Sequence, residues 1–73
     1  MIDYRQIITR DVGIRFGKPC IKGTRITVYD VLSWLAAGMT FNDILENFPE
    51  LSEADILACL SFAADKEHKL QYV

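Results

Sequence analysis

One local motif, a hydroxyl residue followed three positions later by aspartate, constrains this chain more than any other feature. It occurs three times, at residues 27–30, 40–43 and 52–55. In such a capping box the hydroxyl oxygen accepts a hydrogen bond from the backbone N–H three residues on, and the acidic side chain accepts one from the N–H of the cap residue. Negative charge is also favourable at the positive start of a helix dipole. The motif therefore predicts three helices, one beginning at each copy.

Apolar residues flank each motif at the spacing of a hydrophobic staple, in which the residue before the cap contacts the one at the fourth helical position. The pairs are Ile26 with Val31, Met39 with Ile44, and Leu51 with Ile56. Apolar residues then recur every three or four positions, as a helix with one buried face requires. We expect Gly38 to end the first helix as a left-handed cap, and Pro49 to end the second because proline cannot continue a helix.

The third predicted helix is apolar on more than one face. One face carries Ile56, Leu57, Leu60, Ala63 and Ala64. Cys59 and Phe62 fall on another face. We expect the first face to meet the core of the chain, and Cys59 and Phe62 to meet a second subunit. A hydrophobic fraction of 51% is high for 73 residues, because a small domain has much surface to cover. The composition therefore favours a homodimer.

The N-terminal third has a different character. Residues 4–9 contain β-branched side chains that favour a strand, and residues 11–13 indicate a turn. Residues 14–16 suit a second short strand, and residues 20–21 suit pairing with 25–27 around Lys22 and Gly23.

A chain of 73 residues forms one domain at most. The sequence predicts a mainly α (α+β) domain spanning 1–73, with a basic β/loop segment over 1–26 and a three-helix, helix-turn-helix-like bundle over 27–73.

The net charge of −2 conceals an asymmetry. Residues 1–26 hold six basic and two acidic side chains, whereas residues 27–73 hold two basic and eight acidic ones. A polyanion would therefore meet the N-terminal third. The candidate phosphate contacts there are Arg10, Arg15, Lys18, Lys22 and Arg25, and the alternative is a solvated loop made soluble by its charges. Because the third helix begins with Glu53 and Asp55, we expect no major-groove reading by that helix.

The sequence does not support a metal site, a catalytic site or a membrane segment. Two cysteines far apart and one histidine are too few for a zinc site, and Cys20 is more typical of a small buried residue than of a nucleophile. We predict no catalytic residues, enzyme activity, metal, cofactor or small-molecule substrate. The N-terminus lacks the apolar region of a signal peptide, and no run approaches membrane-spanning length. We expect a cytoplasmic protein with reduced thiols and no membrane contact.

The stretch from Gly17 to Val28 resembles the signature of domain-of-unknown-function family 433. Residues 35–38 and 48–52 fit the further pattern of that family. The resemblance implies a homeodomain-like, winged-helix-related fold in a small prokaryotic protein that is antitoxin-like and pairs with a PIN-type nuclease. Such antitoxins commonly dimerise, repress their own promoter and block the nuclease.

The resemblance also implies roles for residues of this motif. Lys18, Lys22, Thr24 and Arg25 are the positions suited to contacting a partner, whereas Gly17, Pro19 and Gly23 shape the backbone. We therefore expect a DNA-binding transcriptional regulator of antitoxin type that acts on its own promoter. The alternative is a protein-interaction module that binds and inhibits a nuclease without contacting DNA.

Overall fold

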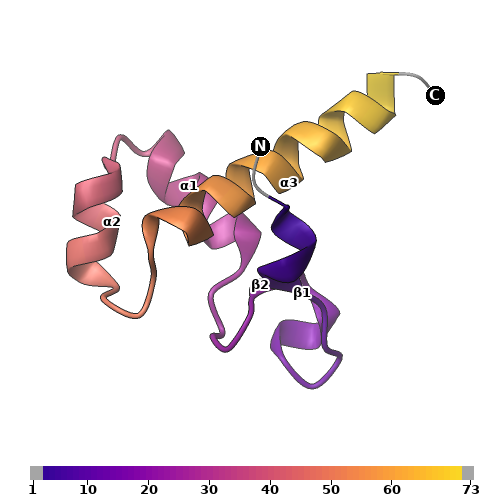
Figure 1. Ribbon diagram of the computed structural model, residues 1–73, viewed down its shortest axis with the longest axis horizontal. Helices are drawn as coiled ribbons and strands as arrows, with labels where there is room; N and C mark the ends of the chain where they lie inside the picture. The colour runs from indigo at the N-terminus through magenta and orange to yellow at the C-terminus, as the bar shows by residue number, and fades with distance from the viewer. Residues whose placement is uncertain (1–2, 72–73) are drawn as a thin grey trace.

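The computed structural model describes the backbone of residues 3–71 and the side chains of residues 3–66. Three helices, α1 (Val28–Ala36), α2 (Phe41–Asn47) and α3 (Glu53–Gln71), follow a short N-terminal segment. That segment contains two 3₁₀ turns and two strands, namely η1 (Tyr4–Gln6), β1 (Ile8–Thr9), η2 (Arg15–Gly17) and β2 (Cys20–Ile21). Figure 1 shows α3 as the long central helix, with α2 beside its N-terminal end and η1 alongside it. The predicted fold class, mainly helical with a short N-terminal β-element, is confirmed.

All three capping boxes form where the sequence predicts them. At α1, Asp30 N donates to Thr27 Oγ1 at 2.9 Å, and Thr27 N donates to Asp30 Oδ2 at 3.1 Å. Thr40 with Asp43 repeats this pair of bonds at α2, and Ser52 with Asp55 repeats it at α3. Each bond satisfies an N–H group that the first turn of a helix leaves without a partner. The helix starts are therefore set by neighbouring residues.

The ends of the first two helices also follow the sequence. Gly38 has a φ of 99°, and its N–H donates to Leu35 O at 3.0 Å. Met39 N donates to Trp34 O at 3.1 Å, which completes a Schellman cap. α2 ends at Asn47, two residues before Pro49.

The predicted strand pairing is wrong in detail. β2 pairs antiparallel with β1, with Ile8 opposite Ile21, and residues 4–6 form η1 instead of extending β1. The expected ribbon from 20–21 to 25–27 is reduced to a single bridge between Cys20 and Thr27 and a bond from Ile21 N to Ile26 O at 2.9 Å. The physical reason is a tight turn, in which Thr24 N donates back to Ile21 O at 3.0 Å.

The second predicted strand, residues 14–16, is absent. Arg15 and Phe16 have positive φ values of 51° and 60°, and Gly17 continues the run at 80°. Left-handed backbone turns the chain sharply, so it cannot extend as a strand. The three residues form η2 at the end of a loop that projects from the β-element (Figure 1).

The core lies where the helices and the β-element meet. Its fully buried large side chains come from β2 and from all three helices, and they are Ile21, Val31, Ile44, Ile56 and Cys59. Thr27 is the one buried polar residue among the described side chains, and its hydroxyl is occupied by the α1 cap. The core therefore joins the N-terminal segment to the helical body.

The face of α3 that meets the core differs from the prediction. Cys59 is fully buried, whereas Leu57 and Leu60 are 39% and 38% exposed. The assignment of Cys59 to a dimer interface is therefore wrong, because its side chain has no surface to offer a second subunit. Both faces of α3 are apolar, so spacing did not discriminate between them. η1 determines which face of α3 is buried, because it covers the side of α3 at Phe62. There the Tyr4 ring packs edge to face on the Phe62 ring, with a centroid separation of 5.3 Å.

Candidate functional site

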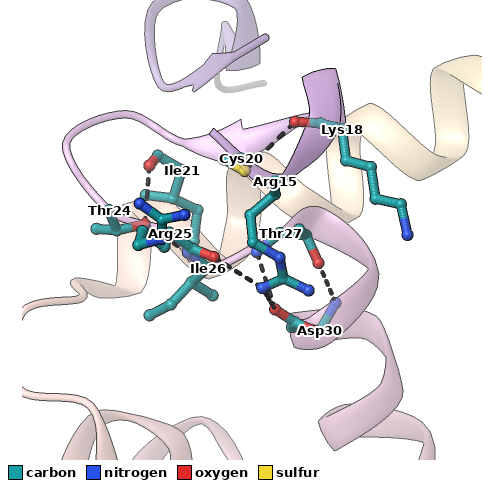
Figure 2. A network of polar contacts seen from close by, with 9 residues as sticks. All are labelled: Arg15, Lys18, Cys20, Ile21, Thr24, Arg25, Ile26, Thr27 and Asp30. Carbon is teal, nitrogen blue, oxygen red and sulfur yellow. Dashed lines mark hydrogen bonds and ion pairs between the residues drawn. The ribbon is translucent and has the colours of Figure 1, made fainter. Parts of the chain in front are cut away.

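Two loops of the N-terminal segment present four exposed cations. Arg10 and Lys18 flank the first loop, residues 10–18, and Lys22 and Arg25 lie in the second, residues 22–26. No carboxylate among the described side chains lies within ion-pair distance of these four charged groups. Figure 2 shows Lys18 extending away from the polar network that holds the loops. These four predicted contact residues are therefore sterically and electrostatically available to an anionic partner.

Arg15 has a different environment from the other predicted cations. Its Nη1 donates to Arg25 O at 3.0 Å and to Asp30 Oδ2 at 3.3 Å. The same Asp30 oxygen accepts from the N–H of Thr27 at the start of α1. Arg15 thus ties the first loop to the second loop and both to α1 (Figure 2). Because its charge is already paired, Arg15 positions the loops and is a poorer phosphate contact than its neighbours.

Thr24 also serves the loop backbone. Its Oγ1 donates to Ile21 O at 2.8 Å and accepts from Ile26 N at 3.0 Å. A hydroxyl that bonds the backbone on both sides stabilises a turn, and Gly23 beside it has a φ of 81°. The hydrogen-bonding capacity of Thr24 is therefore used within the second loop, although the sequence placed Thr24 among the partner contacts.

The tip of the first loop exposes two large apolar side chains that sequence reasoning did not single out. Val12 is 89% exposed and Phe16 is 94% exposed. The loop around them is well defined, because Ile14 N donates to Asp11 O at 2.8 Å and Gly13 N donates to Asp11 Oδ1 at 2.8 Å. The sequence signal was weak, an aromatic residue within a run of glycine and basic residues. We call Val12 and Phe16 the loop tip.

A groove of about 530 Å³ lies between α1 and α3. Its walls are mainly apolar and consist of Pro19, Val28, Tyr29, Leu32, Phe62, Ala63 and Lys66. On the α1 side of the groove, the side chain of Tyr29 is 75% exposed. On the other side, Lys66 Nζ lies 5.4 Å from the centre of the Phe62 ring, which is a cation–π distance. Phe62, which the sequence placed on a dimer face, is thus a wall of this groove.

The opposite charge gathers around α2 and the start of α3. Asp43, Glu46, Glu50 and Glu53 are all exposed there. The N–H and hydroxyl of Thr40 hold the pKa of Asp43 below its usual value, because both hydrogen bonds favour the carboxylate. The turn that precedes α3, the helix at the position of a recognition helix, carries the exposed Glu50 and would therefore repel phosphates.

The described residues offer no cluster of metal ligands. No three His, Cys, Asp or Glu side chains in residues 3–66 gather closely enough to hold a metal ion. Both cysteines are buried and unbridged, and burial raises the pKa of the Cys59 thiol to about 12. A thiol with such a pKa is not a nucleophile at neutral pH. None of the described helices has the length and hydropathy needed to cross a membrane.

Comparisons with known proteins agree with this architecture. The chain is similar to a DUF433 member protein from Anabaena variabilis ATCC 29413, with a TM-score of 0.78 and 23% identity over 89% of this chain and 64% of that one. That likeness supports the fold alone. The chain is also 40% identical over 52 residues to an uncharacterised protein, y4eO, of Sinorhizobium fredii (strain NBRC 101917 / NGR234).

That match covers 71% of this chain but 24% of the relative, so the chain spans about a quarter of the length of the protein it resembles. It likewise spans less than two thirds of the Anabaena protein. The model of a family described as protein of unknown function (DUF433) matches residues 8–63, which include both loops, β1, β2, α1 and α2. The chain belongs to the DUF433 family.

Proposed function

We propose that this chain is a homodimeric, DNA-binding transcriptional regulator of antitoxin type that acts on its own promoter in the cytoplasm. The observation that carries the proposal is the group of exposed cations Lys18, Lys22 and Arg25 on two loops held in place by Arg15. Lysine and arginine side chains that are not paired within the protein release counterions from DNA when they meet phosphates, which supplies most non-specific affinity. The PIN-type nuclease partner is proposed from the resemblance of residues 17–28 to the family signature.

The proposal assigns DNA contact to the loops and not to α3. Glu50 and Glu53 are exposed at the turn before α3, and carboxylates there would face the phosphates on either side of a major groove. The loops carry charge of the opposite sign and project from the β-element (Figure 1). Loops and strand pairs contact DNA in several known classes of binding protein.

Binding of the purified protein to its own upstream DNA, measured by fluorescence anisotropy across a salt series, tests this function. We expect log K to fall with log salt at about 0.9 per phosphate contact. The double variant Lys22→Glu/Arg25→Glu should bind weakly and lose about two units of that slope. Arg5→Glu is a control for charge reversal elsewhere on the surface, because Arg5 is exposed on η1 outside both loops. A wild-type slope near zero, or equal losses in the control, would contradict the proposal.

A second candidate function is a protein-interaction module that inhibits a nuclease without contacting DNA. The exposed loop tip favours it, because large apolar side chains are typical of contact surfaces between proteins. Co-purification of a nuclease with both the wild type and Lys22→Glu/Arg25→Glu, together with no DNA binding by either, would select this alternative.

A further inference from the structure

We propose that the loop tip of one copy of this chain occupies the groove between α1 and α3 of a second copy, and that the reverse contact forms at the same time. This interface replaces the predicted one through Cys59 and deepens the proposed function, resting on its homodimer. The loop tip is Val12 and Phe16, and the groove is the apolar site beside Pro19.

The loop tip is held outward by unusual backbone. Phe16 and its neighbour Arg15 both have positive φ, a conformation that bulky residues rarely adopt. Gly17 lies close behind Val12, where a Cβ at Gly17 would be 3.7 Å from Val12 Cγ1. The bonds of Arg15 to Arg25 and Asp30 fix this geometry. Strained backbone that the rest of the fold maintains is characteristic of residues that bind something.

The groove has the size and chemistry to receive such a tip. Its volume of about 530 Å³ falls in the range of binding pockets, and its walls are mainly apolar. Tyr29 and Phe62 provide aromatic faces on opposite walls. An aromatic side chain buries about 150–250 Å², so two phenylalanines would supply about a quarter of a standard interface of about 1,200–2,000 Å².

The placement of tip and groove on one chain suits two-fold symmetry. An isologous interface uses the same patch on both subunits, with each patch contributing both halves of the contact. Pro19 lines the groove and follows Phe16 by three residues, so tip and groove adjoin. Phe16 does not enter the groove of its own chain, because it remains 94% exposed.

The base of the tip and the rim of the groove include one pair of opposite charges. Asp11 is exposed at the base of the tip and Lys66 is exposed on the rim of the groove. Docking the tip of one copy would bring these opposite charges together twice in the dimer. Insertion of Phe16 between DNA bases is the competing use of an exposed aromatic residue. The presence of an apolar groove of fitting size on the same chain favours the second copy.

Sedimentation equilibrium of Phe16→Asn against the wild type tests the assignment. Asparagine tolerates positive φ, so this variant removes the aromatic ring while keeping the loop, and circular dichroism should show an unchanged fold. We expect its dimer dissociation constant to rise at least about 100-fold, whereas Phe16→Trp, which keeps an aromatic ring, should stay within about fivefold. Lys66→Glu should weaken the dimer about tenfold, because the new carboxylate would face Asp11 of the other copy.

Cross-linking adds a positional test, because a disulfide traps even a weakened dimer. Phe16→Cys mixed with Ala63→Cys, a groove residue, should form a disulfide between chains on oxidation. Phe16→Cys mixed with Leu57→Cys should not, because Leu57 is exposed on α3 outside the groove. The native cysteines are buried and should not compete.

The outcomes separate this interface from the DNA-binding function. Lys22→Glu/Arg25→Glu should lose DNA binding and still dimerise with wild-type affinity. Phe16→Asn that dimerises normally would overturn the interface, and if it had also lost DNA binding it would assign Phe16 to DNA. A wild type that is monomeric at every concentration would overturn the dimer together with its interface while leaving DNA binding to be judged by the salt series.

Discussion

The helical body and the N-terminal segment of this molecule are specified in different ways. In the body, residues 27–66, each helix begins at a capping box whose partners are three residues apart, as Thr27 and Asp30 are. In the segment, residues 3–26, the deciding contacts join distant residues. Arg15 bonds to Asp30, and the Tyr4 hydroxyl donates to the Asp65 carboxylate on α3. The body is therefore set by local sequence and the segment by its docking on the body.

This difference accounts for the position of the candidate binding surfaces in the fold. The segment carries the exposed cations and the loop tip, and it carries the positive φ values of Arg15 and Phe16. Each such residue costs on the order of 1–2 kcal/mol. The helical body offsets that cost through the shared core, where Ile21 of β2 packs with residues of all three helices. Surfaces that bind partners are commonly placed on loops held by a rigid scaffold.

The largest expected effect comes from breaking the body. Ile44 on α2 is fully buried, so Ile44→Ala should lower the free energy of unfolding by about 2–5 kcal/mol through lost transfer energy and a residual cavity. A domain of this size has a total of about 4–11 kcal/mol. Urea denaturation should therefore show a strongly lowered midpoint.

The matched control for this variant is Leu60→Ala, because Leu60 is 38% exposed on α3. A partly exposed leucine loses less apolar burial, so we expect a loss of about 1 kcal/mol or less. Equal losses in the two variants would contradict the observed orientation of α3.

A smaller effect should follow from a change confined to the N-terminal segment. Gly17 has a φ of 80°, and Gly17→Ala should destabilise the chain by about 1–2 kcal/mol because alanine is strained there. We also expect a weakened dimer, since the loop tip depends on this backbone. Thermal unfolding and sedimentation of the same sample measure both effects, and an unchanged melting temperature would show that the loop is not held as described.

A comparable or slightly smaller loss of folding stability should follow from removing one helix cap in the body. Thr40 caps α2, and its hydroxyl accepts from Asp43 N at 3.1 Å. Thr40→Ala should reduce the free energy of unfolding by about 1 kcal/mol, while DNA binding and dimerisation keep wild-type values at temperatures where the variant is folded. Loss of DNA binding by the folded variant would break the separation between body and segment.

The smallest effect concerns the free energy of unfolding at acidic pH. Hydrogen bonds from Thr40 lower the pKa of Asp43 in the folded state. The stabilisation is therefore present above the pKa that Asp43 has in the unfolded chain, and it is lost as pH falls through the lowered folded value. Asp43→Asn should show a shallower loss of stability below about pH 4. If the stability of the variant and of the wild type fell equally with pH in acid denaturation, Asp43 would not contribute to stability in this way.

Sequence reasoning succeeded where the controlling partners are close together in the chain. The starts of all three helices, the cap at Gly38 and the mainly helical fold follow from patterns of a few residues. The pairing of β2 with β1 instead of 25–27 was missed, because a turn closed by Thr24 competes with the ribbon. The orientation of α3 was missed because both of its faces are apolar and η1 decides between them.

In the candidate site, too, the features that depend on distant contacts were not predicted from the sequence. Charge counting found Arg10, Lys18, Lys22 and Arg25, which the structure leaves exposed. It did not distinguish Arg15, because pairing with Asp30 depends on how the loops fold back. The groove between α1 and α3 has no signature in the sequence, since its walls come from two segments that are thirty or more residues apart.

Hydrogen exchange of the protein with and without its own upstream DNA distinguishes DNA contact by the loops from DNA contact by α3, because it reports which backbone amides the DNA covers. We predict slower exchange in residues 18–26, the region of Lys18, Lys22 and Arg25, and unchanged exchange in residues 49–56 at the turn into α3. Protection of residues 49–56 without protection of 18–26 would contradict this prediction and would assign DNA contact to α3.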